Sequence, residues 1–222
     1  MDNARATRPF TDDFTLGTPS LVCRWRLASR ELPLENRHLR ALGQRLVCGR
    51  PVSPQLVAWA KQHIEWTLAD GAFAHPDGVL MVVMDEGGRA AMTVGPYEPL
   101  VPRTTSVLAE RAAAAATEAE RTGVAPESLW LVRGDALVWG RGEGERPSGT
   151  ASLMLDLART LGFPVERRAC LAAEVLAGSA AYDEVFLASD EHGIVPASDA
   201  AGPRAERFRA GYEKLLGSRR QR

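Results

Sequence analysis

Lysine is nearly absent from this 222-residue sequence, because only Lys61 and Lys214 among its 27 basic residues are lysines. Chemistry that requires a lysine amine, such as imine formation with a carbonyl group, therefore has two candidate residues. Both lie in segments with helical spacing of apolar residues, where a charged side chain is expected to face solvent. Arginine supplies the rest of the positive charge.

Cysteine and histidine are also scarce. Cys23, Cys48 and Cys170 are scattered, form no CxxC pair and are odd in number, which argues against a disulfide framework. We expect all three to be buried thiols. The four histidines are isolated from one another and from the cysteines, so the spacing that a metal site requires is missing and no metal is expected.

Long apolar runs and an excess of one charge are missing as well. No run approaches the roughly 20 residues that a membrane-spanning helix needs, and residues 1–14 contain no apolar core typical of a signal peptide. We therefore expect a soluble, cytoplasmic protein without a membrane partner. The formal net charge is -1, so no overall basic field favours nucleic acid as a partner.

The composition is that of a globular protein, with 45% hydrophobic and 25% charged residues. Hydrophobic patterning predicts an α+β domain over residues 1–100. Its predicted elements are a strand at 20–27, a helix at 35–47, a helix at 54–71 that Ser53 caps and Pro54 begins, and a hairpin of strands at 79–84 and 89–95.

Three prolines between residues 96 and 102 indicate a linker, and we place a domain boundary near Val101. Residues 101–222 are then expected to form a second, α/β domain. Its predicted elements are helices at 106–121, 151–161 and 205–216, a hairpin of strands at 129–132 and 136–139, and a strand at 185–188.

One short motif has the chemistry of an anion site. Gly149 and Thr150 precede the helix expected from residue 151, and a helix N-terminus offers unpaired N–H groups to an anion. The alternative is that Thr150 only caps the helix. The glycine-rich residues 140–144 are followed by no GK[ST] signature and are interpreted as a loop, and the GxSxG motif of many hydrolases is absent.

Four segments, in order, resemble the class IV aminotransferases, the fold-type IV pyridoxal-phosphate enzymes that include branched-chain and D-amino-acid aminotransferases and aminodeoxychorismate lyase. The resemblance implies a two-domain, D-amino-acid aminotransferase-like architecture with the site between the domains, and a homodimer. The matching segments are LPLENRHLRAL at 32–42, TEAERTG at 117–123, PSGT followed by LDLARTLGFPVER at 147–167, and YDEVFLASDEHGIVP at 182–196.

The residues that hold the family's cofactor are nevertheless replaced. The Schiff-base lysine aligns with Thr104 or Thr105, and the phosphate-binding arginine aligns with Ala41, although the neighbouring Arg40 is an alternative. Asp190 stands where the family has a phosphate-binding threonine, and a carboxylate repels a phosphate. The segment that carries the glutamate facing the pyridine nitrogen is shortened, and the acid of an early strand aligns with Val22.

These replacements favour a protein that does not bind pyridoxal phosphate. The first hypothesis is a cofactor-independent lyase or transferase that acts on a small anionic metabolite between the domains. The second is a non-catalytic relative or binding partner of the same fold, and the third is a true pyridoxal-phosphate enzyme that uses Lys61 or Lys214. Candidate catalytic residues are Thr104, Thr105, Asp190 and His192; candidate substrate-binding or anion-binding residues are Arg40, Arg103, Gly149 and Thr150.

Overall fold

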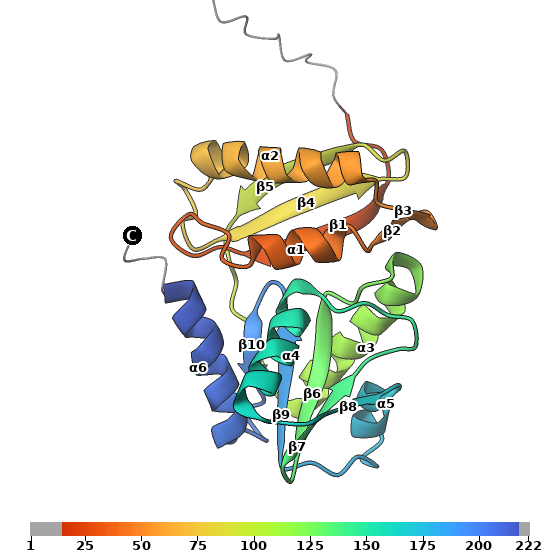
Figure 1. Cartoon of the computed structure of the whole chain (residues 1–222), viewed down its shortest axis with the longest axis vertical. Coiled ribbons are helices and arrows are strands. Elements are labelled where there is room, and N and C mark those ends of the chain that lie inside the picture. The colour runs from red at the N-terminus through yellow and green to blue at the C-terminus, as the bar shows by residue number, and fades with distance from the viewer. Residues whose placement is uncertain (1–14, 218–222) are drawn as a thin grey trace, which may run out of the picture.

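The N-terminal domain is a three-stranded antiparallel sheet covered on one face by two helices (Figure 1). The computed structural model describes residues 15–217. The strand order is β1-β4-β5, and a small hairpin, whose strands β2 and β3 have two residues each, follows the first helix. The elements of this domain are β1 (Pro19–Arg26), α1 (Glu35–Leu42), β2 (Leu46–Val47), β3 (Arg50–Pro51), α2 (Pro54–Gly71), β4 (Val79–Asp85) and β5 (Ala90–Gly95).

Alternation along β1 decides which face of this sheet is buried. Leu21, Cys23 and Trp25 point into the core beneath α1 and α2, whereas Val22 and Arg24 lie on the opposite, more exposed face. Successive side chains of a strand point to opposite faces, so Arg24 points away from this core and can contact the neighbouring domain.

The C-terminal domain has three layers, a mixed five-stranded sheet between two pairs of helices (Figure 1). The strand order is β10-β9-β6-β7-β8, in which only the β7–β8 pair is parallel. Helices α4 and α6 pack on one face, and α3 and α5 on the other. The elements are α3 (Thr105–Thr122), β6 (Glu127–Arg133), β7 (Ala136–Gly140), α4 (Gly149–Leu161), β8 (Val165–Arg168), α5 (Leu171–Leu176), β9 (Glu184–Ser189), β10 (Gly193–Pro196) and α6 (Pro203–Gly217).

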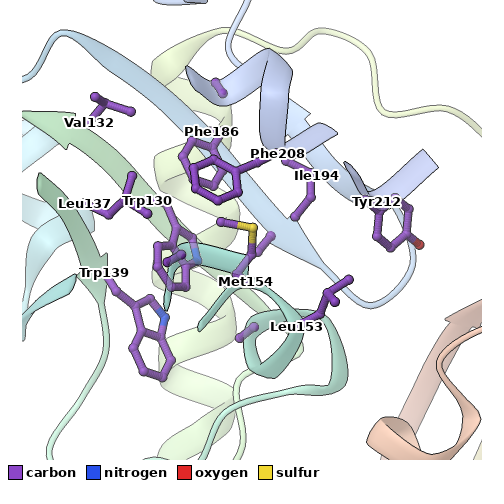
Figure 2. Packing of buried hydrophobic residues seen from close by; sticks show 14 of the residues in the cluster. Trp130, Val132, Leu137, Trp139, Leu153, Met154, Phe186, Ile194, Phe208 and Tyr212 are labelled. Carbon is purple, nitrogen blue, oxygen red and sulfur yellow. The ribbon is translucent and has the colours of Figure 1, made fainter. Parts of the chain in front are cut away.

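Aromatic rings fill the core between this sheet and helices α4 and α6, as Figure 2 shows. Trp130 stacks on Trp139 at 5.3 Å between ring centroids, and Phe186 lies 5.9 Å from Phe208. Rings of this size bury large apolar areas, so this cluster gives the C-terminal domain a core of its own.

Most predicted elements are present, including the Ser53 cap, whose hydroxyl accepts a hydrogen bond from the Leu56 N–H at 3.2 Å. The helix predicted at 35–47 ends at Leu42, because the chain turns into β2. Thr150 is not the cap of α4: Ser148 caps this helix, and Thr150 lies within it. Five short elements were not predicted from the sequence: β2, β3, β8, β10 and α5.

The prediction that all cysteines are buried is correct only for Cys23, since Cys48 and Cys170 are exposed. None of the helices described between residues 15 and 217 combines the length and the apolar composition that a membrane span requires. The segment in which no signal peptide was found, residues 1–14, lies outside the described residues. The cytoplasmic location stays a prediction.

The domains meet where α1 lies against α4 (Figure 1). Arg37 of α1 donates hydrogen bonds to Ser152 Oγ at 3.1 Å and to Asp156 Oδ2 at 2.8 Å, both on α4. These contacts fix the N-terminal end of α4 against the N-terminal domain.

Candidate functional site

The turn between β9 and β10 lies at the junction of the domains. The Arg26 N–H of β1 donates to the Asp190 carbonyl at 3.0 Å, and the Asp190 N–H donates to the Pro126 carbonyl at 3.1 Å. Ser189 Oγ accepts hydrogen bonds from the N–H groups of Glu191 and His192 at 3.2 and 3.0 Å. The turn is therefore held by two backbone bonds at Asp190 and by the Ser189 hydroxyl at residues 191 and 192, which positions the three side chains at 190–192.

Gly193, the residue after this turn, must be a glycine. Its φ is +72°, and a Cβ there would lie 2.7 Å from Cζ of Tyr212 and closer to Cε1. A left-handed backbone against an aromatic ring excludes larger residues. Gly193 thus fixes the direction in which the turn enters β10.

Asp190 points inward, into a sealed cluster at the N-terminus of α4. Its Oδ1 accepts the Thr150 N–H at 2.8 Å, and its Oδ2 lies 3.6 Å from His38 Nδ1, which is too long for a hydrogen bond. The exposed fractions are 3% for Asp190, 2% for His38 and 0% for Thr150. Trp25 stacks on the His38 ring at 5.1 Å and 18°, so the cluster is closed by the N-terminal domain.

Electrostatics keep this buried carboxylate ionised. Burial acts to raise the pKa of Asp190, but the His38 imidazole, the Thr150 N–H and the Arg45 guanidinium together bring it below its ordinary value. A hydrogen bond to the charged form and nearby positive charge both favour ionisation. The cluster therefore holds an anion that belongs to the chain.

Arg45 is a buried residue next to this cluster that was not among the predicted site residues. It is 2% exposed, and its Nη1 lies 3.1 Å from Glu118 Oε1 of α3. Burial raises the pKa of the Cys23 thiol, and the positive charge of Arg45 acts in the opposite direction. Nothing in the local sequence separates this arginine from the many surface arginines, because its partner is 73 positions away.

An open cleft of about 340 Å³ lies beside the sealed cluster, between β1 and α3. Arg24 binds Glu191 in a bidentate manner at 2.6 Å for each bond, and Arg111 binds Glu127 at 2.9 and 2.8 Å. Ser189 Oγ also donates to Glu127 Oε1 at 2.8 Å. The residues that line the cleft are Val22, Arg24, Arg111, Ala114, Ala115, Glu118, Pro126, Glu127, Ser189 and Glu191.

His192 lies near this cleft, next to Glu191, and its ring centroid is 5.7 Å from that of Tyr97. Its Nδ1 is buried without a hydrogen-bond partner. Burial lowers the pKa of His192; Glu191 and Glu127 act to raise it, and Arg111 and Arg24 act to lower it, with a net decrease. The imidazole is therefore neutral at pH 7 and able to accept a proton.

The structure brings Gly149, Thr150 and Asp190 together, and His192 lies in the same turn as Asp190. The other four candidates lie elsewhere. Arg40 and Arg103 are exposed. Thr104 caps α3 through the Val107 N–H, and Thr105 donates both its N–H and its hydroxyl to Asp199 Oδ1 at 2.8 Å. The functional roles assigned to all eight candidates stay predictions.

Two further features bear on binding. A larger cavity of about 480 Å³ lies between α3 and α5, and its rim includes the glycine-rich residues 140–144. Its walls are mostly alanine and glycine, with Glu127 shared with the cleft. Among residues 15–217, no three His, Cys, Asp or Glu side chains gather so that they could hold a metal ion.

The residues of this site do not fit pyridoxal phosphate. Thr105 has no amine and is bound to Asp199, while Lys61 and Lys214 are exposed on α2 and α6. The N–H of Thr150, which a phosphate would need, is already bonded to the buried carboxylate of Asp190. A second anion at this position would meet like charge in a site closed to water.

No protein-family model matches the sequence, and no curated protein sequence matches it. Solved structures do match. A fold IV-transaminase from Curtobacterium pusillum has a TM-score of 0.61 at 13% identity, over 92% of this chain and 85% of that one. A hypothetical aminotransferase from Mycobacterium tuberculosis, bound to α-ketoglutarate and PMP, has a TM-score of 0.61 at 15% identity, over 96% and 95% of the two chains.

The branched-chain amino acid aminotransferase from Escherichia coli also matches, with a TM-score of 0.52 at 14% identity over 92% of this chain and 90% of that one. Matches of this kind compare backbone arrangement and say little about side chains at a site. The two-domain α/β architecture described above is therefore the class IV aminotransferase-like fold.

Proposed function

We propose that this chain works without pyridoxal phosphate and binds a small zwitterionic metabolite, such as an amino acid, in the cleft between its domains. The observation that carries the proposal is the balance of charge in the cleft. Arg24 faces Glu191, Arg111 faces Glu127, and Glu118 faces the buried Arg45. The charged side chains of the lining are thus held in arginine–glutamate pairs, and neither arginine of the lining is an unpaired cation.

This balance of charge favours a zwitterion over the purely anionic metabolite expected from the sequence. A purely anionic ligand could approach Arg24 and Arg111 only by displacing or facing the carboxylates that already bind them. A zwitterion can place its carboxylate near an arginine and its ammonium near a glutamate, so that every charge keeps a partner. The cleft volume of about 340 Å³ suits a ligand of amino-acid size.

The two arginines can rearrange to accept such a ligand. The Arg24 side chain is 47% exposed and that of Arg111 is 35% exposed, so each guanidinium already contacts solvent. Exchange of a partly exposed ion pair for a ligand contact requires little desolvation. Arg24 lies on β1 and Glu191 lies in the C-terminal domain, so ligand binding would act directly on the contact between the domains.

Ligands matched in carbon skeleton test this proposal. Thermal stability is measured with norvaline in both enantiomers, with pentanoate as the anion and with butylamine as the cation. We expect a saturable rise in Tm with the zwitterion alone. Failure of every zwitterionic amino acid tested, or an equal response to pentanoate, would contradict the proposal.

A variant pair assigns the response to the cleft. Arg24→Gln removes a guanidinium of the cleft and is expected to abolish the response. Arg133→Gln removes a similar ion pair with Glu166, at 2.6 Å, from the far end of β6 and is expected to keep it. Loss of the response in both variants would instead indicate a general effect of charge.

A lyase or transferase reaction is the second candidate function, and His192 is the observation that favours it. The His192 imidazole is neutral at pH 7, partly exposed and next to Glu191 of the cleft, so it is the group we expect to take a proton from a bound ligand. Exchange of the α-proton of a bound amino acid with deuterated water, followed by NMR, tests this role. We expect exchange in the natural chain and none in His192→Gln, whereas binding without exchange would leave the non-catalytic function.

The homodimer that the resemblance implies is a further part of the proposal. Sedimentation equilibrium of the purified chain measures its mass directly. A monomer at micromolar concentration would contradict this part.

A further inference from the structure

The N-terminus of α4 has the features of an anion site, and in the natural chain the Asp190 carboxylate occupies it. Ser148 Oγ accepts the Ala151 N–H at 3.2 Å, which leaves the Thr150 N–H for another acceptor. That acceptor is Asp190 Oδ1 at 2.8 Å. Free N–H groups at the start of a helix carry partial positive charge, so a carboxylate is a favourable occupant.

The walls of the site are shaped around this occupant. Gly149 lies under the His38 ring, and a Cβ on Gly149 would lie 2.8 Å from Cε1 and 3.1 Å from Cγ of His38. The His38 imidazole can therefore pack this closely on the start of α4 only because Gly149 has no side chain. Trp25 stacks on the same ring and limits its movement.

Two polar atoms at the site have no hydrogen-bond partner. They are His38 Nδ1 and Thr150 Oγ1, and both belong to residues that are at least nine-tenths buried. His38 Nδ1 lies 3.6 Å from Asp190 Oδ2, so one carboxylate fills the position without satisfying every group around it. Buried polar groups without partners are rare, and they mark a place where an oxygen-rich anion would find further contacts.

We propose that Thr150 and His38 form a site for a small carboxylate, and that the Asp190 side chain is its resident anion. The backbone of Asp190 is held independently by Pro126 and Arg26. Removal of the side chain should therefore leave the site in place and vacant. A free carboxylate of the size of the lost group can then enter.

Chemical rescue tests the proposal on the full chain. Asp190→Ala removes the carboxylate, and formate is the probe that replaces it. We expect Asp190→Ala to melt below the natural chain and to regain roughly 3 °C in Tm, saturably, at formate concentrations about tenfold above the dissociation constant. Chloride at the same ionic strength should have no such effect.

Asp190→Asn is the matched control. Its amide has the size of the lost carboxylate and keeps an oxygen that can accept the Thr150 N–H. The site is then filled, so formate should raise its Tm no more than that of the natural chain. An equal response to formate in Asp190→Ala and Asp190→Asn would overturn the proposal.

Asp190→Ser serves if Asp190→Ala does not fold in ordinary buffer. Recovery of folded protein with formate, but not with chloride, would support the proposal for either variant. Failure of formate to restore folding in both would overturn it. The test does not depend on a ligand in the cleft, so its failure leaves the zwitterion proposal to be judged by its own titration.

Discussion

Substitution of Gly149 by alanine perturbs a tight contact between the two domains. The added Cβ would lie 2.8 Å from Cε1 of His38 and closer still to Nδ1, distances that real side chains do not tolerate. The ring cannot turn aside freely, because Trp25 stacks on it at 5.1 Å. Either α1 moves away from α4 or His38 leaves the Asp190 carboxylate.

The size of the effect follows from two opposing contributions. Overpacking of a tight contact costs about 3 kcal/mol at the upper end of the usual range. Replacement of glycine by alanine in a helix returns about 1 kcal/mol or less. We therefore expect a net loss of about 2 kcal/mol, which lowers Tm by about 4–8 °C in a chain of this length.

Scanning calorimetry measures this loss, and Gly211→Ala is the matched control. A Cβ on Gly211, in α6, would lie 3.8 Å from Leu157 Cδ1, an ordinary contact. The same substitution should therefore stabilise the chain there by about 0.5–1 kcal/mol. A Tm for Gly149→Ala equal to or above that of the natural chain would refute the packing described for His38. In the double variant with His38→Ala, the alanine at 149 should cost little beyond the loss of the imidazole.

Three further outcomes are expected. Addition of pyridoxal phosphate should give no aldimine absorbance band, and reduction with borohydride followed by peptide mapping should find no adduct. An adduct on Lys61 or Lys214 would instead support the hypothesis of a pyridoxal-phosphate enzyme. The Gly17 N–H, followed by the N–H and guanidinium of Arg89, lowers the pKa of Asp85 from 3.8 to about 2. A carboxyl group whose pKa is lower in the folded chain than in the unfolded chain stabilises the fold when it is ionised. The contribution of Asp85 is therefore complete above about pH 4 and is lost as the pH falls through about 2. Asp85→Asn should remove this acid-dependent part of the unfolding free energy, and acid titrations of the two proteins that run parallel would contradict it. The imidazole of His192 should titrate below its ordinary 6.5 by NMR, with His192→Gln to assign the signal, and a value at or above 6.5 would show that it is not buried as described.

Local patterning was sufficient to predict most elements. The Ser53–Pro54 start of α2 and the alternation in β1 are local signals, so their predictions match the structure closely. The short elements β8 and α5 were missed, because four to six residues give too little periodicity to detect. The start of α4 was predicted two residues too late, at residue 151 instead of Gly149, because Ser148 and Thr150 are equally suitable cap residues.

The candidate site was less predictable, because its contacts join distant positions. The pairing of Arg24 with Glu191 spans 167 positions, and no spacing rule relates them. The resemblance drew attention to Asp190 as a charge that would repel a phosphate. It could not indicate that this carboxylate itself bonds to Thr150, which depends on how the β9–β10 turn enters the domain junction.

An anion that is covalently part of the chain has a constant effective concentration. A protein that recruits a free ligand to a helix N-terminus gains stability according to the ligand's concentration and affinity, and it loses that stability when the ligand is depleted. Asp190 reaches the N–H of Thr150 from 40 positions away in the same chain. The N-terminus of α4, against which His38 of the N-terminal domain packs, is therefore occupied independently of any metabolite supply, and it cannot respond to that supply.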